Sequence, residues 1–250
     1  MIYFKVLWLN AAIILLLPIV FLQALWVRRI TAVLPEPSGD RVLSSTGGKT
    51  VPKINILVIG DSAAAGVGAA TQEGALAGLI YSSLSQRGPT RVLLHAKTGY
   101  KSEDVLNLLQ QLPKQHFSTT LISIGVNDVT KFVSLRRWQR NISAIESLLS
   151  QKFGCQNILF TALPPIHAFP ALPQPLRGLL GFRAFLLNKA MAARIASSPS
   201  SEMLYVRALK LGGTAKDVKQ SGLMAEDGFH PSSKGYDIWA RSALTRFRSS

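Results

Sequence analysis

The chain has 250 residues, 48% of them hydrophobic, which is enough for one sizeable buried core and hardly two. It carries 28 Lys and Arg against 13 Asp and Glu, giving a formal net charge of +15. Such a surface attracts polyanions or acidic lipid headgroups, or is simply well solvated. No finger spacing of Cys and His and no aromatic RNA-binding motif accompanies the charge, so we expect no nucleic-acid partner. The single cysteine, Cys155, excludes an intramolecular disulfide framework.

The amino-terminal segment is an almost unbroken apolar run. Val6 to Val27 contains no charged residue, and a run of about 22 residues is long enough to cross a bilayer as a helix. A cleavable signal peptide would usually have a shorter apolar region and a small-residue cleavage site, and no clear site precedes Arg28. We therefore predict a transmembrane helix within residues 1–30 and a single-pass protein, suggestive of a bacterial inner membrane. Basic residues stand on both sides of the run, so the side on which the rest of the chain lies stays open.

The next segment, residues 31–53, is rich in Pro, Gly, Ser and Thr and is predicted to be a linker. From residue 54 to residue 250, short apolar runs alternate with amphipathic stretches, which is typical of a parallel sheet wrapped by helices. The predicted strands cover 54–59, 91–95, 120–124, 157–162 and 203–206. The predicted helices cover 72–86, 102–112, 135–152, 179–197 and 233–247. These five pairs predict one three-layer α/β domain.

Polar or glycine-containing blocks follow the apolar runs or precede helices. Because ligands of such sheets bind beyond the carboxyl ends of the strands, these blocks are the candidates for chemistry. Each block alone could be an ordinary turn or helix cap, whereas four at such places indicate a site. The blocks are Gly60-Asp61-Ser62, Gly99, Gly125-Val126-Asn127-Asp128 and Asp227-Gly228-Phe229-His230-Pro231.

The blocks contain the side chains that activate a serine. A serine hydroxyl is a poor nucleophile unless a base takes its proton, and a histidine serves best when a carboxylate fixes its tautomer. Asp227 and His230, three positions apart, can meet directly and act on Ser62. The backbone N–H groups of Ser62 and Gly99 and the side-chain amide of Asn127 can hold the negative oxygen that develops during acyl transfer.

With these four blocks in order, the sequence resembles the SGNH (GDSL) hydrolases, a family named for its Ser, Gly, Asn and His. The match spans about residues 54–247 and departs from the family at Ala63, where leucine is usual. The resemblance implies a flavodoxin-like three-layer fold with a five-stranded parallel sheet. It also implies ester hydrolysis through an acyl-enzyme without metal or organic cofactor. An ordinary α/β-hydrolase fits poorly, because Ala64 stands where its elbow needs glycine.

Several assignments stay open at this level. The expected substrate is an acyl ester, either small, a lysophospholipid or an O-acetyl sugar. The same residues would also serve an acyltransferase, and a non-catalytic membrane protein binding anionic lipid is the rival from another class. Asp128 is expected to be a local hydrogen-bonding support, and His95, His116 and His167 to be structural or surface residues. The proline-rich loop 163–177 is expected either to line an acyl pocket or touch the bilayer, or to be a rigid connector.

Overall fold

The computed structural model describes residues 2–46, 52–206 and 221–247, with side chains from residue 16 onward. Parts of the predicted linker (47–51) and of the predicted domain (207–220 and 248–250) therefore lie outside the described residues. The strands are β1 (Val42–Ser44), β2 (Ile54–Gly60), β3 (Thr90–Ala96), β4 (Thr119–Ser123), β5 (Asn157–Thr161) and β6 (Ser201–Leu204). The α-helices are α1 (Ile2–Ile30), α2 (Ser62–Ala65), α3 (Leu76–Ser85), α4 (Ser102–Gln111), α5 (Val126–Thr130), α6 (Leu135–Gln151), α7 (Leu176–Ile195) and α9 (Ser233–Leu244). Two 3-10 turns, η1 (Gln72–Gly74) and η2 (Ile166–Ala168), complete the described elements.

The described strands form one mixed sheet in the order β1-β3-β2-β4-β5-β6. The five predicted strands are all present, and they pair in parallel. Numbered along the chain, these five have the order 2-1-3-4-5, which is that of flavodoxin-like sheets. The prediction of five strands was one short, because β1 adds an antiparallel edge strand beside β3. This strand lies within 31–53, the segment predicted as a linker, and its three residues were too few to show a strand pattern.

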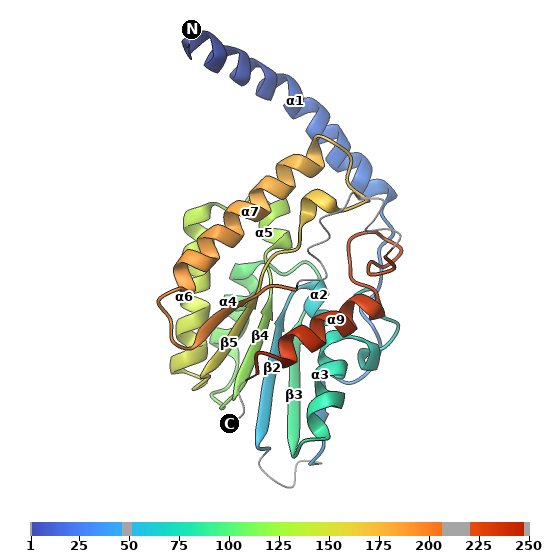
Figure 1. The fold of residues 1–250 in the computed structure, drawn as a ribbon, viewed down its shortest axis with the longest axis vertical. Coiled ribbons are helices and arrows are strands. Elements are labelled where there is room, and N and C mark those ends of the chain that lie inside the picture. The colour runs from blue at the N-terminus through green and yellow to red at the C-terminus, as the bar shows by residue number, and fades with distance from the viewer. Residues whose placement is uncertain (1, 47–51, 207–220, 248–250) are drawn as a thin grey trace.

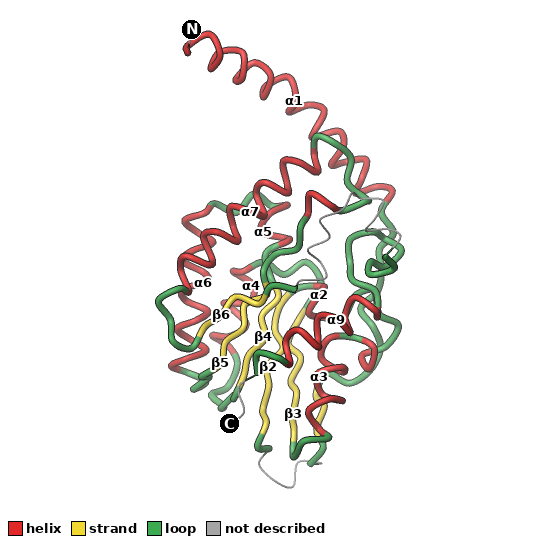
Figure 2. The backbone as a smooth tube through the Cα atoms, viewed as in Figure 1, coloured by secondary structure: helices red, strands yellow, loops and turns green. Residues whose placement is uncertain are grey.

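Helices cover both faces of the sheet and produce two apolar cores (Figures 1 and 2). On one face, α4, α6 and α7 pack over β2, β4 and β5, with Trp138 of α6 completely buried. On the other face, α3 and α9 pack together over β2 and β3, with Tyr236 of α9 completely buried. The β2 strand contributes alternate side chains to the two cores, for example Leu57 to the first and Val58 to the second. This alternation explains why the strand is a continuous apolar run in the sequence.

The amino-terminal helix α1 differs from the predicted transmembrane span. Among the residues that the structure describes, no helix is both long enough and apolar enough to cross a membrane. The predicted single-pass membrane localisation is therefore wrong. The carboxyl-terminal half of α1 instead contacts the α/β domain, where Val27 is buried in the first core. The amide of Gln23 donates to the carbonyl oxygen of Gln174 and accepts from the N–H of Leu176. A long apolar run indicates a buried segment, and part of this run is buried against the rest of the protein and not in a bilayer.

The end of β2 lies unusually close to the end of β4. Gly60 has a φ of +157°, and a Cβ atom at this position would lie 1.9 Å from the carbonyl oxygen of Ser123. The same carbonyl accepts the N–H of Asp61 at 2.9 Å. The absence of a side chain at residue 60 therefore lets the chain turn out of the sheet immediately before Ser62.

Gly60→Ala tests this close approach. We expect the substitution to lower the free energy of unfolding by about 1–3 kcal/mol more than Gly88→Ala does, because only the first forces a backbone shift. Gly88 is a matched control, since it has a similar φ of +156° and nothing within 4 Å of its added Cβ. Urea denaturation of both variants measures the difference. Equal losses would show that backbone conformation alone, and not contact with Ser123, requires glycine at residue 60.

Candidate active site

Ser62 lies where β2 ends and α2 begins, at the carboxyl edge of the sheet (Figure 1). The carboxylate of Asp61 caps α2 by accepting the N–H of Ala63 at 3.1 Å. Gly66 ends this one-turn helix with a positive φ. The short helix therefore presents Ser62 on a turn that is fixed at both ends.

The structure brings the three predicted triad residues together. Nε2 of His230 lies 2.8 Å from Oγ of Ser62, and Nδ1 of His230 lies 2.5 Å from Oδ2 of Asp227. An ionised carboxylate can only accept, so Nδ1 carries the ring proton of a neutral His230 and Nε2 is free to accept from the serine hydroxyl. This is the arrangement in which a histidine can act as the base for a serine. Glu226, the neighbouring acid, is not part of this hydrogen-bond chain.

Asp227 is held as an anion by its own loop. Its other oxygen, Oδ1, accepts the backbone N–H groups of Phe229 at 2.9 Å and His230 at 3.0 Å. Burial alone would raise the pKa of Asp227, but hydrogen bonds from the His230 side chain and from these two N–H groups outweigh it and lower the pKa. The three-residue offset thus lets one carboxylate orient the imidazole and close its own turn.

The pKa of Asp61 is shifted in the opposite direction to that of Asp227. Its side chain is buried, and burial raises the pKa of Asp61 to about 7, despite the hydrogen bond from Ala63. The charge of His230 opposes this rise and that of Asp128 adds to it. Around neutral pH, Asp61 therefore exchanges between its acid and its carboxylate next to the nucleophile.

The three residues predicted to supply oxyanion donors, Ser62, Gly99 and Asn127, all line one pocket. Gly99 has a φ of +88°, a left-handed conformation that favours glycine. The side-chain amide of Asn127 donates to the carbonyl oxygen of Tyr100 at 3.0 Å, which fixes Asn127 against the turn that contains Gly99. An amide group has two N–H bonds, so the second stays available to a ligand.

A buried polar network supports these donors from below. Asp128, completely buried, accepts both the N–H and the hydroxyl of Ser102, the hydroxyl at 2.6 Å. Asn141 of α6 donates to that same hydroxyl at 2.8 Å. The network ties α4, α5 and α6 together directly behind Asn127, so the expected supporting role of Asp128 is confirmed.

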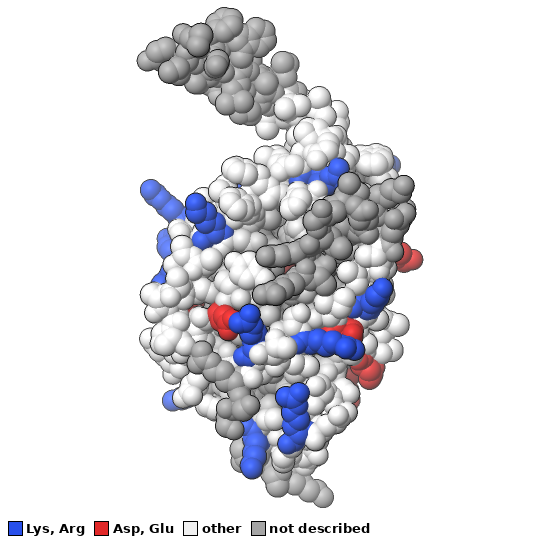
Figure 3. Space-filling model, viewed as in Figure 1, with Lys and Arg blue, Asp and Glu red and all other residues white. Residues whose placement is uncertain are grey.

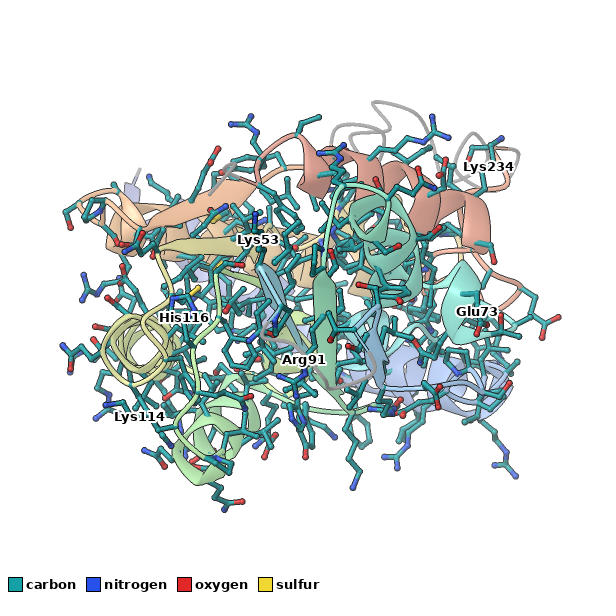
Figure 4. All side chains as sticks on the ribbon, turned by 90° about the horizontal axis from the view of Figure 1, so that it is seen from below. Lys53, Glu73, Arg91, Lys114, His116 and Lys234 are labelled. Carbon is teal, nitrogen blue, oxygen red and sulfur yellow. The ribbon has the colours of Figure 1, made fainter. Side chains whose placement is uncertain are left out.

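The other histidines lie apart from the triad. His95, His116 and His167 are not among the described residues that line the pocket. Figure 4, which views the molecule from below, shows His116 and Lys114 at the end of the molecule where Lys53 precedes the first residue of β2. Cys155 is buried, and burial raises the pKa of its thiol, which disfavours the reactive thiolate.

A pocket of about 340 Å³ opens beside Ser62 and His230. Its walls are mainly apolar and come from the proline-rich loop, the region around the triad histidine, α9 and the segment that follows α1. The apolar lining includes Val33, Leu34, Leu163, Pro165, Phe169, Met224, Phe229 and Trp239. Of the two interpretations of loop 163–177, the structure favours the pocket wall, because its first part contributes five lining residues (Leu163, Pro164, Pro165, Ala168 and Phe169). Asn188 of α7 fixes that part by pairing both backbone groups of Leu163.

Comparison with known proteins identifies the family. The model of the GDSL-like Lipase/Acylhydrolase family matches residues 58–238. The chain belongs to this family. As a GDSL-like acylhydrolase it is an ester-hydrolysing enzyme, in agreement with the resemblance based on the four sequence blocks.

Solved structures share the fold of this GDSL-like chain. Phospholipase A1 from Streptomyces albidoflavus NA297 is 18% identical, with a TM-score of 0.61 over 77% of this chain and 98% of the other. An acetylxylan esterase from Geobacillus stearothermophilus is 17% identical, with a TM-score of 0.55 over 80% and 96%. A G-D-S-L family member from Veillonella parvula DSM 2008 is 16% identical, with a TM-score of 0.59 over 78% and 98%. No curated protein sequence gave a match.

Sequence reasoning missed the contribution of the segment after α1. Residues 31–34 line the pocket, although they lie in the predicted linker and upstream of the family match. The apolar triplet Ala32-Val33-Leu34 interrupts an otherwise polar, proline-containing stretch, and it was the available signal. Trp239 of α9 was missed as well, because its spacing indicates only the buried face of a helix.

The two site aspartates predict opposite effects of pH on stability. Asp61 binds its proton up to about pH 7 in the folded chain but only to about pH 4 when unfolded, so its contribution to the free energy of unfolding falls as pH rises through this window. Asp61→Asn keeps an acceptor for Ala63 and removes the titration. We expect this variant to gain stability relative to the wild type between pH 4 and pH 8, by up to about 4 kcal/mol. Urea denaturation across this range measures it.

Asp227→Asn is the matched control. The lowered pKa of Asp227 means that its carboxylate stabilises the fold above about pH 4, and that this contribution is lost as pH falls through the folded-state pKa. This variant should therefore be less stable than the wild type at pH 7, with the deficit shrinking in acid. If Asp61→Asn instead showed no gain towards pH 8, the Asp61 carboxyl would titrate normally in the folded chain.

Proposed function

We propose that this enzyme is a serine esterase that cleaves esters of hydrocarbon acyl chains through an acyl-enzyme on Ser62. The observation that carries the proposal is the hydrogen-bonded chain Asp227–His230–Ser62 at the base of an apolar pocket. A partly buried, oriented imidazole in contact with a serine hydroxyl has little structural value and a clear catalytic one.

The proposed reaction proceeds in two halves. The oxygen of Ser62 attacks the carbonyl carbon of the ester while His230 takes the hydroxyl proton. The tetrahedral oxyanion is held by the N–H groups of Ser62 and Gly99 and the amide of Asn127. The carbon–oxygen bond to the leaving alcohol breaks, and His230 protonates that alcohol. Water, deprotonated by His230, then attacks the acyl-enzyme and releases the acid and the free serine.

The lining of the pocket supports an acyl chain as the bound group. Among the described residues that line it, the only ionisable side chains are those of Asp61, Asp227 and His230. No Lys or Arg in this set could bind a phosphate, although basic residues are abundant elsewhere on the surface (Figure 3). The other polar side chains in this set are neutral, and they are Thr31, Ser62, Thr98, Ser123, Asn127 and Thr161. The structural relatives, a phospholipase and an acetylxylan esterase, do not set the substrate of this chain, and its mainly apolar pocket favours a neutral, apolar acyl group.

Ser62→Ala tests the proposed function. The wild type should hydrolyse p-nitrophenyl esters and prefer butyrate or octanoate to acetate, since longer acyl groups bury more apolar surface. The variant should lose activity by a factor of about 10³–10⁶. A fluorophosphonate probe should label the wild type at Ser62 and leave the variant unlabelled. Ser82→Ala, on the exposed side of α3, is the matched control and should keep full activity. Hydrolysis that persists in a folded Ser62→Ala would overturn the proposal.

A further inference from the structure

Glu36 contacts the turn that precedes Gly99, although it lies outside the family match. Oε1 of Glu36 accepts the backbone N–H of Thr98 at 2.7 Å and the hydroxyl of Thr98 at 2.8 Å. Its other oxygen, Oε2, pairs with the guanidinium of Arg41. Arg41 in turn donates to the carbonyl oxygen of Ala96 at 2.6 Å. The Glu36–Arg41 pair therefore holds the chain at both Ala96 and Thr98.

These contacts fix the residue immediately before the proposed oxyanion donor. The turn leaves β3 at Ala96. Among the described residues its backbone is otherwise held by Lys97 N–H to the carbonyl of Gly60 and Tyr100 N–H to the carbonyl of Lys97, both 3.2 Å long, and by the Asn127 amide to the carbonyl of Tyr100 at 3.0 Å. The bonds to Glu36 are shorter and involve a charged acceptor, which makes them stronger. Among the described residues, the N–H of Gly99 has no hydrogen-bond acceptor, so its direction depends on its neighbours.

The Glu36 side chain has the charge needed to hold this turn. Burial would raise its pKa, but the hydrogen bonds from Thr98 and the charge of Arg41 outweigh it and lower the pKa, so the carboxylate is ionised at neutral pH. Glu36 itself does not line the pocket that contains Ser62, whereas Thr98 and Gly99 do. It can thus act on the reaction only through the turn.

We propose that Glu36 is a positioning residue that aims the N–H of Gly99 at the oxyanion. The proposal rests on the proposed ester hydrolysis and adds a residue to its machinery that lies upstream of the family domain. An aimed donor is worth most in the transition state, where the negative charge is largest, and little in the bound substrate.

Glu36→Ala tests the proposal through a split between kcat and KM. With an ester that the wild type cleaves, kcat should fall about tenfold or more. A misplaced donor stabilises the oxyanion less well, so it causes part of the rate loss that deleting the donor would cause. KM should change less than about twofold, because the contacts that bind substrate and transition state equally well are unchanged. Inhibition by a trifluoromethyl ketone, whose hydrate-free carbonyl forms a tetrahedral adduct with Ser62, should weaken by the same factor as kcat. Glu36→Gln, which keeps an acceptor for Thr98, should recover part of the loss.

Controls separate positioning from general damage. Glu103→Ala breaks a comparable surface ion pair, with Arg137, and should leave kcat and inhibition unchanged. Should Glu36→Ala fail to fold, Glu36→Gln and Thr98→Val supply the same comparison, with smaller decreases in kcat. Unchanged kcat and unchanged inhibition in folded variants would overturn the role of Glu36. Activity that depends on Ser62 in the wild type would still stand, so the two proposals fail separately.

A second observation, independent of Glu36, concerns substrate choice. Residues 31–34 line the pocket and are held from the side of α1. Both the N–H and the hydroxyl of Thr31 donate to the carbonyl of Val27, at 2.9 and 2.7 Å, and Val27 is buried in the core. Gln23, one turn earlier, bonds to Gln174 and Leu176 at the end of the proline-rich loop. The two apolar walls of the pocket are therefore joined to each other through α1.

We infer that Leu34, which is partly buried and lines the pocket, sets acyl chain length in the enzyme that we propose. Leu34→Ala should enlarge the pocket and raise the ratio of kcat/KM for decanoate over butyrate by about tenfold. Leu34→Trp should fill it and lower this ratio by a similar factor. Leu135→Ala, an exposed leucine on α6 outside the pocket, is the control and should leave the ratio unchanged. Identical ratios in both Leu34 variants, with Ser62-dependent activity intact, would overturn the inference.

Discussion

The site depends on one topological constraint, that the carboxyl ends of parallel strands meet at a single edge of the sheet. Ser62 and His230 are 168 positions apart in the chain, yet they lie within hydrogen-bonding distance. Ser62 leaves the end of β2, Gly99 follows β3 and Asn127 follows β4. The central strand β2 pairs with both of the others, so the nucleophile sits between its two proposed donor groups. The close contact between Gly60 and Ser123 lets the chain leave the sheet sharply enough for this meeting.

The electrostatics of the site follow from how each carboxyl group is solvated. Asp227, Asp61 and Asp128 all lie near the same edge and all are buried. Asp227 has a histidine and two backbone N–H groups around it and is held ionised, whereas burial dominates at Asp61 and Asp128 and raises the pKa of each. Of the three acids, Asp227 alone has its pKa lowered by its surroundings, and it is the one that faces the imidazole.

Much of this could be predicted from the sequence, and the failures have physical causes. Apolar runs such as Ile54 to Ile59 marked the central strands because both faces of the sheet are covered, and the Asp227–His230 spacing marked the base because three residues close a local turn. Strand β1 was missed because its pairing is set by β3 and not by its own three residues. The membrane helix was wrongly predicted, and hydropathy along the chain also did not show that the end of α1 buries Val27 and contacts Gln174 and Leu176 through Gln23. The roles of individual side chains at the site remain predictions for the experiments above.

The segment upstream of the family match contacts the site, so it belongs with the α/β domain and not with a separate linker. Residues 31–41 were expected to separate two parts of the chain, but they run along the catalytic edge, with Leu34 on the pocket, Glu36 on the Gly99 turn and Ser38 bonded to the N–H of Gln72. A flexible linker would lose conformational entropy at each such contact, so several fixed contacts in eleven residues require compensating interactions. The buried ring of Pro37 and the Glu36–Arg41 pair provide them. Domain boundaries drawn from the family match alone would therefore cut away part of the pocket wall and the support of the oxyanion turn, and a fragment beginning at residue 54 should differ from the full chain in both substrate range and turnover.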